Sequence, residues 1–220
     1  MLDSGYYGPI EVVGQKETCI NLGGNGRVRW MPDGSALLTT IAEQQGPKEY
    51  RYAVVSVDPH QCRVLNELYV TLKGAHDPDL SSSGQLLAFA GPDSIIVVDL
   101  DTQQEWLLGE GIVPSWSPDD EWLAYTGLDG LYVVRKDGTD GQRVLEYWVQ
   151  CKMTPSGLTW NDWPPLPEWS PDGKWLVYHR EERGKYAIYK LNLETHEEEL
   201  IVEGGLNPDW RSTPVDTQAK

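Results

Sequence analysis

One sequence motif recurs along the whole chain. Trp-Ser-Pro-Asp-Gly-Lys-Trp-Leu-Val-Tyr at 169–178 repeats as Trp-Ser-Pro-Asp-Asp-Glu-Trp-Leu-Ala-Tyr at 116–125. Weaker copies start at Trp30 and Leu80, and a fifth begins around Trp210. Repeats of this length are typical of architectures in which one small structural unit is stacked many times.

Each copy is predicted to form one four-stranded antiparallel sheet. In the copy at 169–178 the first strand runs up to Trp169, and Pro-Asp-Gly supplies the chemistry of a tight turn. Further strands are expected at 175–178, 186–191 and 198–202, which are rich in aromatic and β-branched residues. We therefore expect an all-β chain with almost no helix.

Several such sheets must stack, because one sheet alone cannot bury both of its faces. Four-stranded units of about 40–50 residues are typical of β-propeller blades.

Four copies of the repeat are complete. The segment 10–22 resembles third and fourth strands without a beginning, and 208–211 resembles a first strand without a continuation. We predict a five-bladed β-propeller whose last blade is shared by the N- and C-termini. Six blades would need about 40 more residues.

The predicted domain organisation follows from these copies. We expect a single propeller domain over 1–211, with blades that begin near Trp30, Leu80, Trp116, Trp169 and Trp210. An insertion loop at 146–167 interrupts the repeat, and 212–220 is expected to be a disordered tail because it is polar and follows the last repeat.

The repeat resembles that of TolB-like β-propellers, which are related to WD-repeat-like domains. The resemblance rests on Pro-x-Trp-Ser-Pro-Asp-Gly-Lys-x-Leu-x-Tyr followed by Ile-Tyr-x-x-x-Leu-x-Thr, and it is best at 167–205. It implies a non-catalytic scaffold that binds a protein or peptide. It also favours a periplasmic or secreted location, although the sequence as given begins with no signal peptide.

Charge and composition exclude several classes of partner. The net charge of −16 disfavours nucleic acid and anionic lipid, which would be repelled. No apolar run is long enough to span a membrane, so membrane insertion is not expected. The four histidines are scattered and no phosphate-loop or nucleophile-elbow motif is present, so we expect no metal, no cofactor and no catalytic residues. We expect a monomer.

The three cysteines, Cys19, Cys62 and Cys151, cannot all be paired with one another. We expect three free thiols that pack as small apolar groups. One disulfide with one thiol left over is the alternative.

The 146–167 insertion is the first candidate binding region. It contains three indoles and three further polar or aromatic side chains: Tyr147, Trp148, Trp160, Asn161, Asp162 and Trp163. Insertions in repeat proteins often lie on a binding face. The indoles could contact a protein partner or stack on a sugar ring in a lectin-like site. In the structural alternative they fold back and bury against their own blade.

The second candidate is the set of residues that directly precede the repeat anchors: Arg29, Asp79, Ser115, Glu168 and Asp209. Strand alternation turns these side chains to the face opposite the anchors. If they reach the propeller axis, the three carboxylates could form a glycosidase-like acidic centre. The family resemblance argues against catalysis, so a non-catalytic role is the principal hypothesis.

Overall fold

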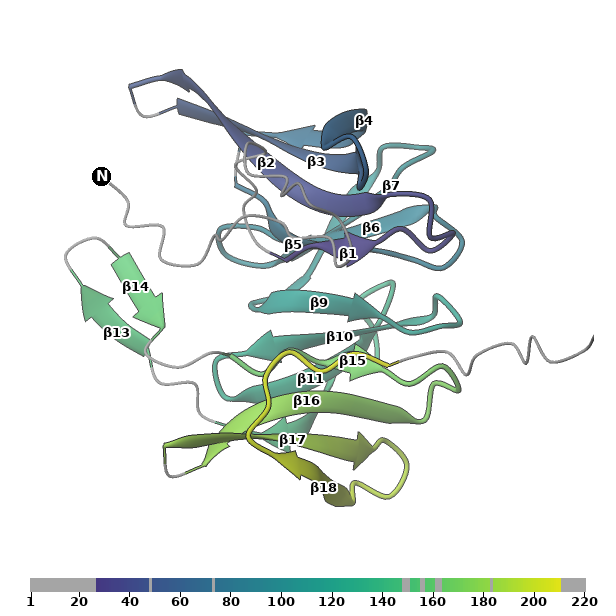
Figure 1. Ribbon diagram of the computed structural model, residues 1–220, viewed down its shortest axis with the longest axis vertical. Helices are drawn as coiled ribbons and strands as arrows, with labels where there is room; N and C mark the ends of the chain where they lie inside the picture. The colour runs from purple at the N-terminus through teal and green to yellow at the C-terminus, as the bar shows by residue number, and fades with distance from the viewer. Residues whose placement is uncertain are drawn as a thin grey trace, which may run out of the picture.

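The computed structural model describes residues 27–47, 49–72, 74–147, 164–182 and 184–210, and the backbone of 151–154 and 157–160. Every regular element in this part of the chain is a β-strand, as Figure 1 shows. The prediction of an all-β chain is therefore confirmed. No helix in the described ranges has the length and hydropathy needed to cross a membrane.

Sixteen of the strands form four antiparallel sheets, each a meander in chain order. Blade 1 contains β1 (Arg29–Trp30), β2 (Leu37–Gly46), β3 (Glu49–Asp58) and β4 (Arg63–Thr71). Blade 2 contains β5 (His76–Leu80), β6 (Leu86–Ala90), β7 (Ile95–Asp99) and β8 (Glu105–Gly109). Blade 3 contains β9 (Ile112–Trp116), β10 (Trp122–Gly127), β11 (Gly130–Arg135) and β12 (Gln142–Glu146). Blade 4 contains β15 (Glu168–Trp169), β16 (Trp175–Glu182), β17 (Lys185–Asn192) and β18 (Glu198–Glu203).

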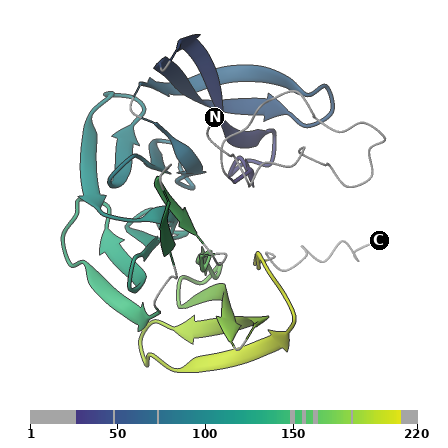
Figure 2. The same ribbon diagram turned by 90° about the vertical axis from the view of Figure 1, so that its left-hand side faces the viewer.

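The four blades follow one another round an arc, with their first strands toward its inside (Figure 2). Strand β5 contacts β2 and β9, and β9 contacts β15, so the first strands of blades 2, 3 and 4 lie beside an adjacent blade. This arrangement is a β-propeller. The segment 10–22 and residue Arg211, which were expected to help build a fifth blade, lie outside the described residues, so the blade number stays a prediction. Residues 208–210 are described and are not part of a strand.

The turn after each first strand has the geometry that its sequence predicts. Gly34 and Gly173 both have φ of 69°, a left-handed conformation that glycine adopts without steric cost. Asp120 takes the equivalent place in the Pro-Asp-Asp copy, with φ of 59°. Its carboxylate accepts hydrogen bonds from the backbone N–H groups of Ser82 (2.6 Å) and Ser83 (2.9 Å), so this turn also joins blade 3 to blade 2.

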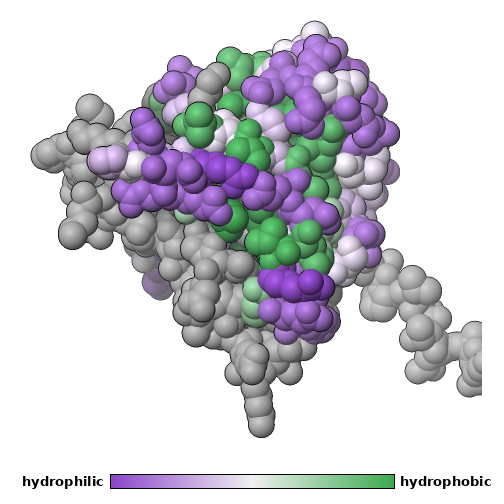
Figure 3. Space-filling view, turned by 90° about the horizontal axis from the view of Figure 1, so that it is seen from above, coloured by the Kyte–Doolittle hydropathy of each residue, from purple (hydrophilic) through white to green (hydrophobic). Residues whose placement is uncertain are grey.

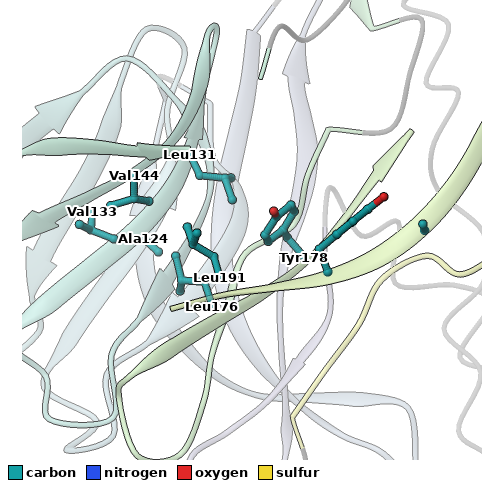
Figure 4. Close-up of a cluster of buried hydrophobic side chains, with 9 residues drawn as sticks. Ala124, Leu131, Val133, Val144, Leu176, Tyr178 and Leu191 are labelled. Atoms are coloured by element: carbon teal, nitrogen blue, oxygen red, sulfur yellow. The ribbon is translucent and has the colours of Figure 1, made fainter. Parts of the chain in front are cut away.

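Apolar side chains fill the seams between adjacent blades. Figure 4 shows the seam between blades 3 and 4, where Leu131 and Val133 face Leu176 and Tyr178. Successive residues of one strand pack into opposite seams: Leu123 packs toward blade 2, whereas Ala124 packs toward blade 4. Because both faces of an inner blade are covered, its middle strands are continuously apolar rather than alternating.

The anchor residues occupy related places in the seams, with one exception. Trp116 is buried against blade 2, and Trp169 packs on the cluster between blades 3 and 4. Leu80 packs in the seam between blades 1 and 2. Trp30, the anchor of the first copy, is 55% exposed. The reason is its position: it belongs to the first blade of the arc, and no described sheet precedes it.

The outer strand of blade 1 exposes apolar side chains. Val64, Leu65 and Val70 of β4 are about two-fifths exposed, and the neighbouring Leu72 is 76% exposed. In Figure 3, which views the molecule from above Figure 1, apolar residues lie on both sides of a hydrophilic band. The outer strand of blade 1 therefore presents an apolar surface to solvent, although the chain as a whole carries a net charge of −16.

The insertion at 146–167 contains regular structure that the sequence reasoning did not predict. A two-stranded hairpin, β13 (Cys151–Thr154) and β14 (Gly157–Trp160), pairs Cys151 with Trp160 and Thr154 with Gly157. It pairs with none of the four blades and projects from one end of them (Figures 1 and 2). The segment was expected to be a loop because it is rich in proline and tryptophan, and because two strands of only four residues each show too little periodicity to be recognised.

The expectation of three free thiols is wrong at Cys62. This residue, in the turn between β3 and β4, is disulfide-bonded. The sulfur atom to which it is joined lies outside the described side chains. The sequence left this pairing open because a disulfide depends on how close two segments lie in space, which residue spacing does not reveal.

Candidate functional site

Four of the five residues that precede the anchors form a buried cluster on the first strands. Arg29 lies on β1, Asp79 on β5, Ser115 on β9 and Glu168 on β15. Each first strand contributes one polar side chain, because strand alternation directs the residue before each anchor to the side opposite the anchor. We call these four residues, together with Arg27, the inner-strand cluster.

Arg29 connects blade 1 to the other three blades. Its Nη1 donates to Glu168 Oε2 at 2.8 Å, and its Nε lies 3.3 Å from Asp79 Oδ1. Its Nη2 donates to the carbonyl oxygen of Pro114 on β9, at 3.4 Å. One guanidinium therefore contacts first strands that are up to 139 residues away in sequence.

The carboxylates of the cluster have further partners. Glu168 Oε1 lies 2.6 Å from Arg27 Nη2, and Ser115 Oγ donates to Glu168 Oε2 at 3.3 Å. Asp79 Oδ2 accepts the backbone N–H of Trp116 at 2.7 Å. The side chains of Arg29, Asp79 and Glu168 are only 8–15% exposed. Both carboxylates are thus held by arginines or backbone N–H groups in a largely buried position.

The environment moves the pKa values of the two carboxyl groups in opposite directions. Burial raises the pKa of Asp79 to about 6, against the effect of Arg29, and the negative charge of Glu168 adds to the rise. Burial would also raise the pKa of Glu168, but Arg29 and Arg27 together hold it below its usual value. Glu168 is therefore the anion that neutralises the two arginines, and Asp79 is the group closer to protonation.

The fifth predicted residue, Asp209, lies at the margin of the cluster. Asp209 is exposed on one side, but the neighbouring cluster partly desolvates its carboxyl group, and this desolvation together with the negative charge of Glu168 raises its pKa. The neighbouring Trp210 donates its indole N–H to the backbone carbonyl of Glu168 at 3.1 Å. Trp169 makes the equivalent bond to the carbonyl of Ser115 at 3.0 Å. The same indole-to-carbonyl bond therefore occurs at two anchors beside the cluster, whereas the buried indole N–H of Trp116 has no such partner among the described residues.

Sequence reasoning missed Arg27 as a member of the cluster. Arg27 lies two residues before Arg29, so the period of an extended strand predicts that the two side chains lie on one face. Asp77 also lies two residues before Asp79, but its φ of 52° and a bulge between His76 and Asp79 interrupt that period. The backbone N–H of Arg27 donates to Asp77 Oδ1 at 2.9 Å. The two-residue period was the available signal.

The residues of the insertion are mostly beyond what the structure describes. Trp148, Asn161, Asp162 and Trp163 lie outside the described residues, and only the backbone of Trp160 is described. Tyr147 donates its backbone N–H to the carbonyl of Asp129 at 3.1 Å. The insertion begins there, at the end of blade 3 from which the hairpin projects. Within the described ranges no three His, Cys, Asp or Glu side chains are grouped to hold a metal.

Comparison with solved structures places this architecture among known propellers. A TolB protein from Agrobacterium tumefaciens matches with a TM-score of 0.56 and 19% identity, over 80% of this chain and 61% of that one. The Cps50 (Swd1) β-propeller domain of Myceliophteria thermophila matches with a TM-score of 0.50 and 18% identity, over 87% and 59%. A chain of a nidogen–laminin complex matches with a TM-score of 0.53 and 11% identity, over 77% and 64%.

This chain spans about six-tenths of each of those structures. No family model and no curated protein matches the sequence. The sheets, their order round the arc and the likeness to these structures agree with the resemblance read from the repeat. The chain therefore has a β-propeller fold similar to the folds of TolB-like and WD-repeat proteins.

Proposed function

We propose that this propeller is a non-catalytic scaffold that binds a protein or peptide at the end of the blades from which the β13–β14 hairpin projects. The observation that carries the proposal is this hairpin, an addition to the repeat that pairs with none of the four blades. Loops and insertions on a rigid scaffold are where binding residues concentrate. Protein binding among structurally similar propellers, such as that in the nidogen–laminin complex, is consistent with it.

The inner-strand cluster supports the non-catalytic part of the proposal. A glycosidase needs one carboxylic acid and one free carboxylate at a defined separation on either side of a substrate bond. Glu168 instead contacts two arginines, and Asp79 accepts a backbone N–H. We infer that the cluster holds the blades together rather than acting on a substrate. Purified protein should show no turnover of aryl glycosides.

Removal of the hairpin tests the binding proposal. Residues 149–163 would be replaced by a short Gly-Ser linker, and the control would shorten the β2–β3 hairpin, which ends the long strands of blade 1. Both variants would be compared with the unmodified chain by photo-crosslinking in cells, after matching thermal unfolding. The cross-linked partner should disappear only when 149–163 are replaced. Equal cross-linking by all three proteins would contradict the proposal.

A glycan-binding role for the insertion remains the second candidate, because three of its residues are tryptophans. Neutral oligosaccharides on an array should then bind the unmodified chain, and Trp160→Ala should abolish that binding. An array without signal, together with a cross-linked protein partner, would favour the first candidate.

The disulfide at Cys62 supports the proposed location outside the cytoplasm. Disulfides form and persist in oxidising compartments and are rare in the cytosol of most organisms. A periplasmic or secreted setting, which the TolB-like resemblance also favours, is therefore our proposal. Fractionation of cells that express the native gene tests it.

A further inference from the structure

A groove lies between blades 2 and 3, at the end of the strands opposite the hairpin. Its volume is about 730 Å³, within the usual range for ligand sites. It is lined by side chains from both blades, among them Gln85, Asp99 and Trp106 of blade 2 and Lys136 and Asp137 of blade 3. These residues lie in or beside the turns that precede β6, β8 and β12, whereas the β13–β14 hairpin follows the other end of β12. The groove is thus separate from the surface proposed above.

Trp106 forms a fixed aromatic wall of the groove. It lies on β8, is half-buried, and donates its indole N–H to the backbone carbonyl of Lys136 on the neighbouring blade. The ring orientation is therefore set by a contact that joins the two blades. Because its N–H is already used, what the ring offers to a ligand is its flat π-face.

Elsewhere in this chain, tryptophans in blades 3 and 4 carry a stacked cation. Arg135 lies over the Trp122 ring at 4.6 Å, and Lys190 lies over the Trp175 ring at 4.6 Å. Among the described residues, none of the chain's own cations is placed over Trp106 in this way. A basic side chain over its ring would be attracted by the ring quadrupole, as at the other two sites.

Two carboxylates of the groove are fixed in position as partners for such a cation. Asp99 Oδ1 accepts the backbone N–H groups of Asp101 (2.9 Å) and Thr102 (2.8 Å). Asp137 Oδ1 accepts the N–H and hydroxyl of Thr139. These bonds lower the pKa of both carboxyl groups and fix their positions, and a side-chain hydrogen bond from Thr102 adds to the effect at Asp99. Each carboxylate is therefore held in place as an anion that can pair with a ligand cation.

The charge balance of the groove favours a cation over an anion. Its lining holds three aspartates, Asp99, Asp120 and Asp137, and one lysine. That lysine, Lys136, is already paired with Glu121 at 2.6 Å. The net charge of the whole chain, −16, acts in the same direction over longer distances.

We propose that this interblade groove binds a lysine or arginine side chain from a basic segment of a partner protein. The cation stacks on Trp106 and pairs with Asp99 and Asp137. This site goes beyond the proposed function, because it lies at the opposite end of the blades and needs no residue of the insertion.

A labelled Arg-Gly-Arg-Gly-Arg peptide is the probe, and fluorescence anisotropy at low salt gives its Kd. The double variant Asp99→Asn with Asp137→Asn should weaken binding about tenfold. The matched control is Glu194→Gln with Glu197→Gln, which removes two charges from the equivalent turn of blade 4 and should change Kd less than about twofold. Trp106→Leu, which leaves the charge unchanged, should weaken binding about fivefold.

A groove variant that fails to fold would give no binding data, so nuclear magnetic resonance of the unmodified chain provides a second test. The indole N–H signal of Trp106 should shift on addition of the peptide, and those of the other tryptophans should shift less. Replacement of 149–163 should leave peptide affinity unchanged, which separates this site from the proposed function. Equal losses in the groove variant and its control, or binding of neutral maltohexaose without binding of the peptide, would overturn the proposal.

Discussion

Neutralising Glu168 should destabilise the propeller far more than neutralising Asp79, although both carboxylates bind the same arginine. Glu168→Gln preserves the shape of the side chain but leaves two buried guanidinium groups with one fewer anion. Removing one member of a buried ion pair typically costs about 3–5 kcal/mol. Because a domain is stable by only about 5–15 kcal/mol, this is a large part of the total free energy of unfolding.

Asp79→Asn should behave differently because the pKa of Asp79 is raised to about 6 in the folded protein. With a pKa of about 3.9 when unfolded, the ionised carboxylate costs the folded state about 3 kcal/mol at neutral pH. An asparagine at this position removes that cost and still accepts the N–H of Trp116 through its side-chain oxygen. We therefore expect its free energy of unfolding at pH 7.5 to exceed that of the unmodified chain, by up to about 3 kcal/mol.

The two variants should also differ in pH dependence. The raised pKa of Asp79 means that its stabilising contribution is full below about pH 4 and is lost as the pH rises through about 6. The lowered pKa of Glu168 means that its contribution is present above its unfolded value of about 4.3 and is lost as the pH falls through its folded value. Relative to the unmodified chain, Asp79→Asn should therefore become less favourable from pH 7.5 to pH 4, whereas the cost of Glu168→Gln should stay constant down to about pH 5.

Urea unfolding, followed by tryptophan fluorescence at several pH values, measures both effects. The slope of free energy against urea must stay unchanged for the midpoints to be compared. Equal destabilisation by the two variants at pH 7.5 would refute the reasoning. So would a pH profile for Asp79→Asn that runs parallel to that of the unmodified chain.

Three further outcomes are expected. Gly173→Ala should destabilise the chain by about 1–2 kcal/mol in the same urea assay, because φ of 69° is unfavourable for a residue with a Cβ atom; an unchanged midpoint would contradict the turn geometry. Trp169→Phe should cost about 1–3 kcal/mol through loss of the indole bond to Ser115, whereas Trp30→Phe, at an exposed position, should cost less than about 0.5 kcal/mol. Because Cys62 is disulfide-bonded, thiol titration of the denatured chain should find one thiol before reduction and three after it; three thiols before reduction would disprove the bond.

Much of the local structure could be predicted from the sequence because short-range chemistry decides it. Pro-Asp-Gly sets the turns after β1 and β15, and each of these turns is closed by hydrogen bonds between residues a few positions apart. The aromatic and β-branched runs gave the strands, with ends that differ by a few residues from those expected. The short strands of β13 and β14 could not be predicted, since four residues in a Pro- and Trp-rich segment carry too little periodicity.

The candidate site divides in the same way. The repeated motif was enough to identify the side chains that precede the anchors and point away from the seams, because alternation along an extended strand is a local property. Only the arc of blades decided that Arg29 reaches Glu168 across 139 residues, and that the two carboxyl groups acquire pKa values shifted in opposite directions. The groove behind Trp106 and the disulfide at Cys62 also required the tertiary structure. The physical reason is that burial and the distances between segments remote in sequence arise when the sheets pack, and no single repeat contains that information.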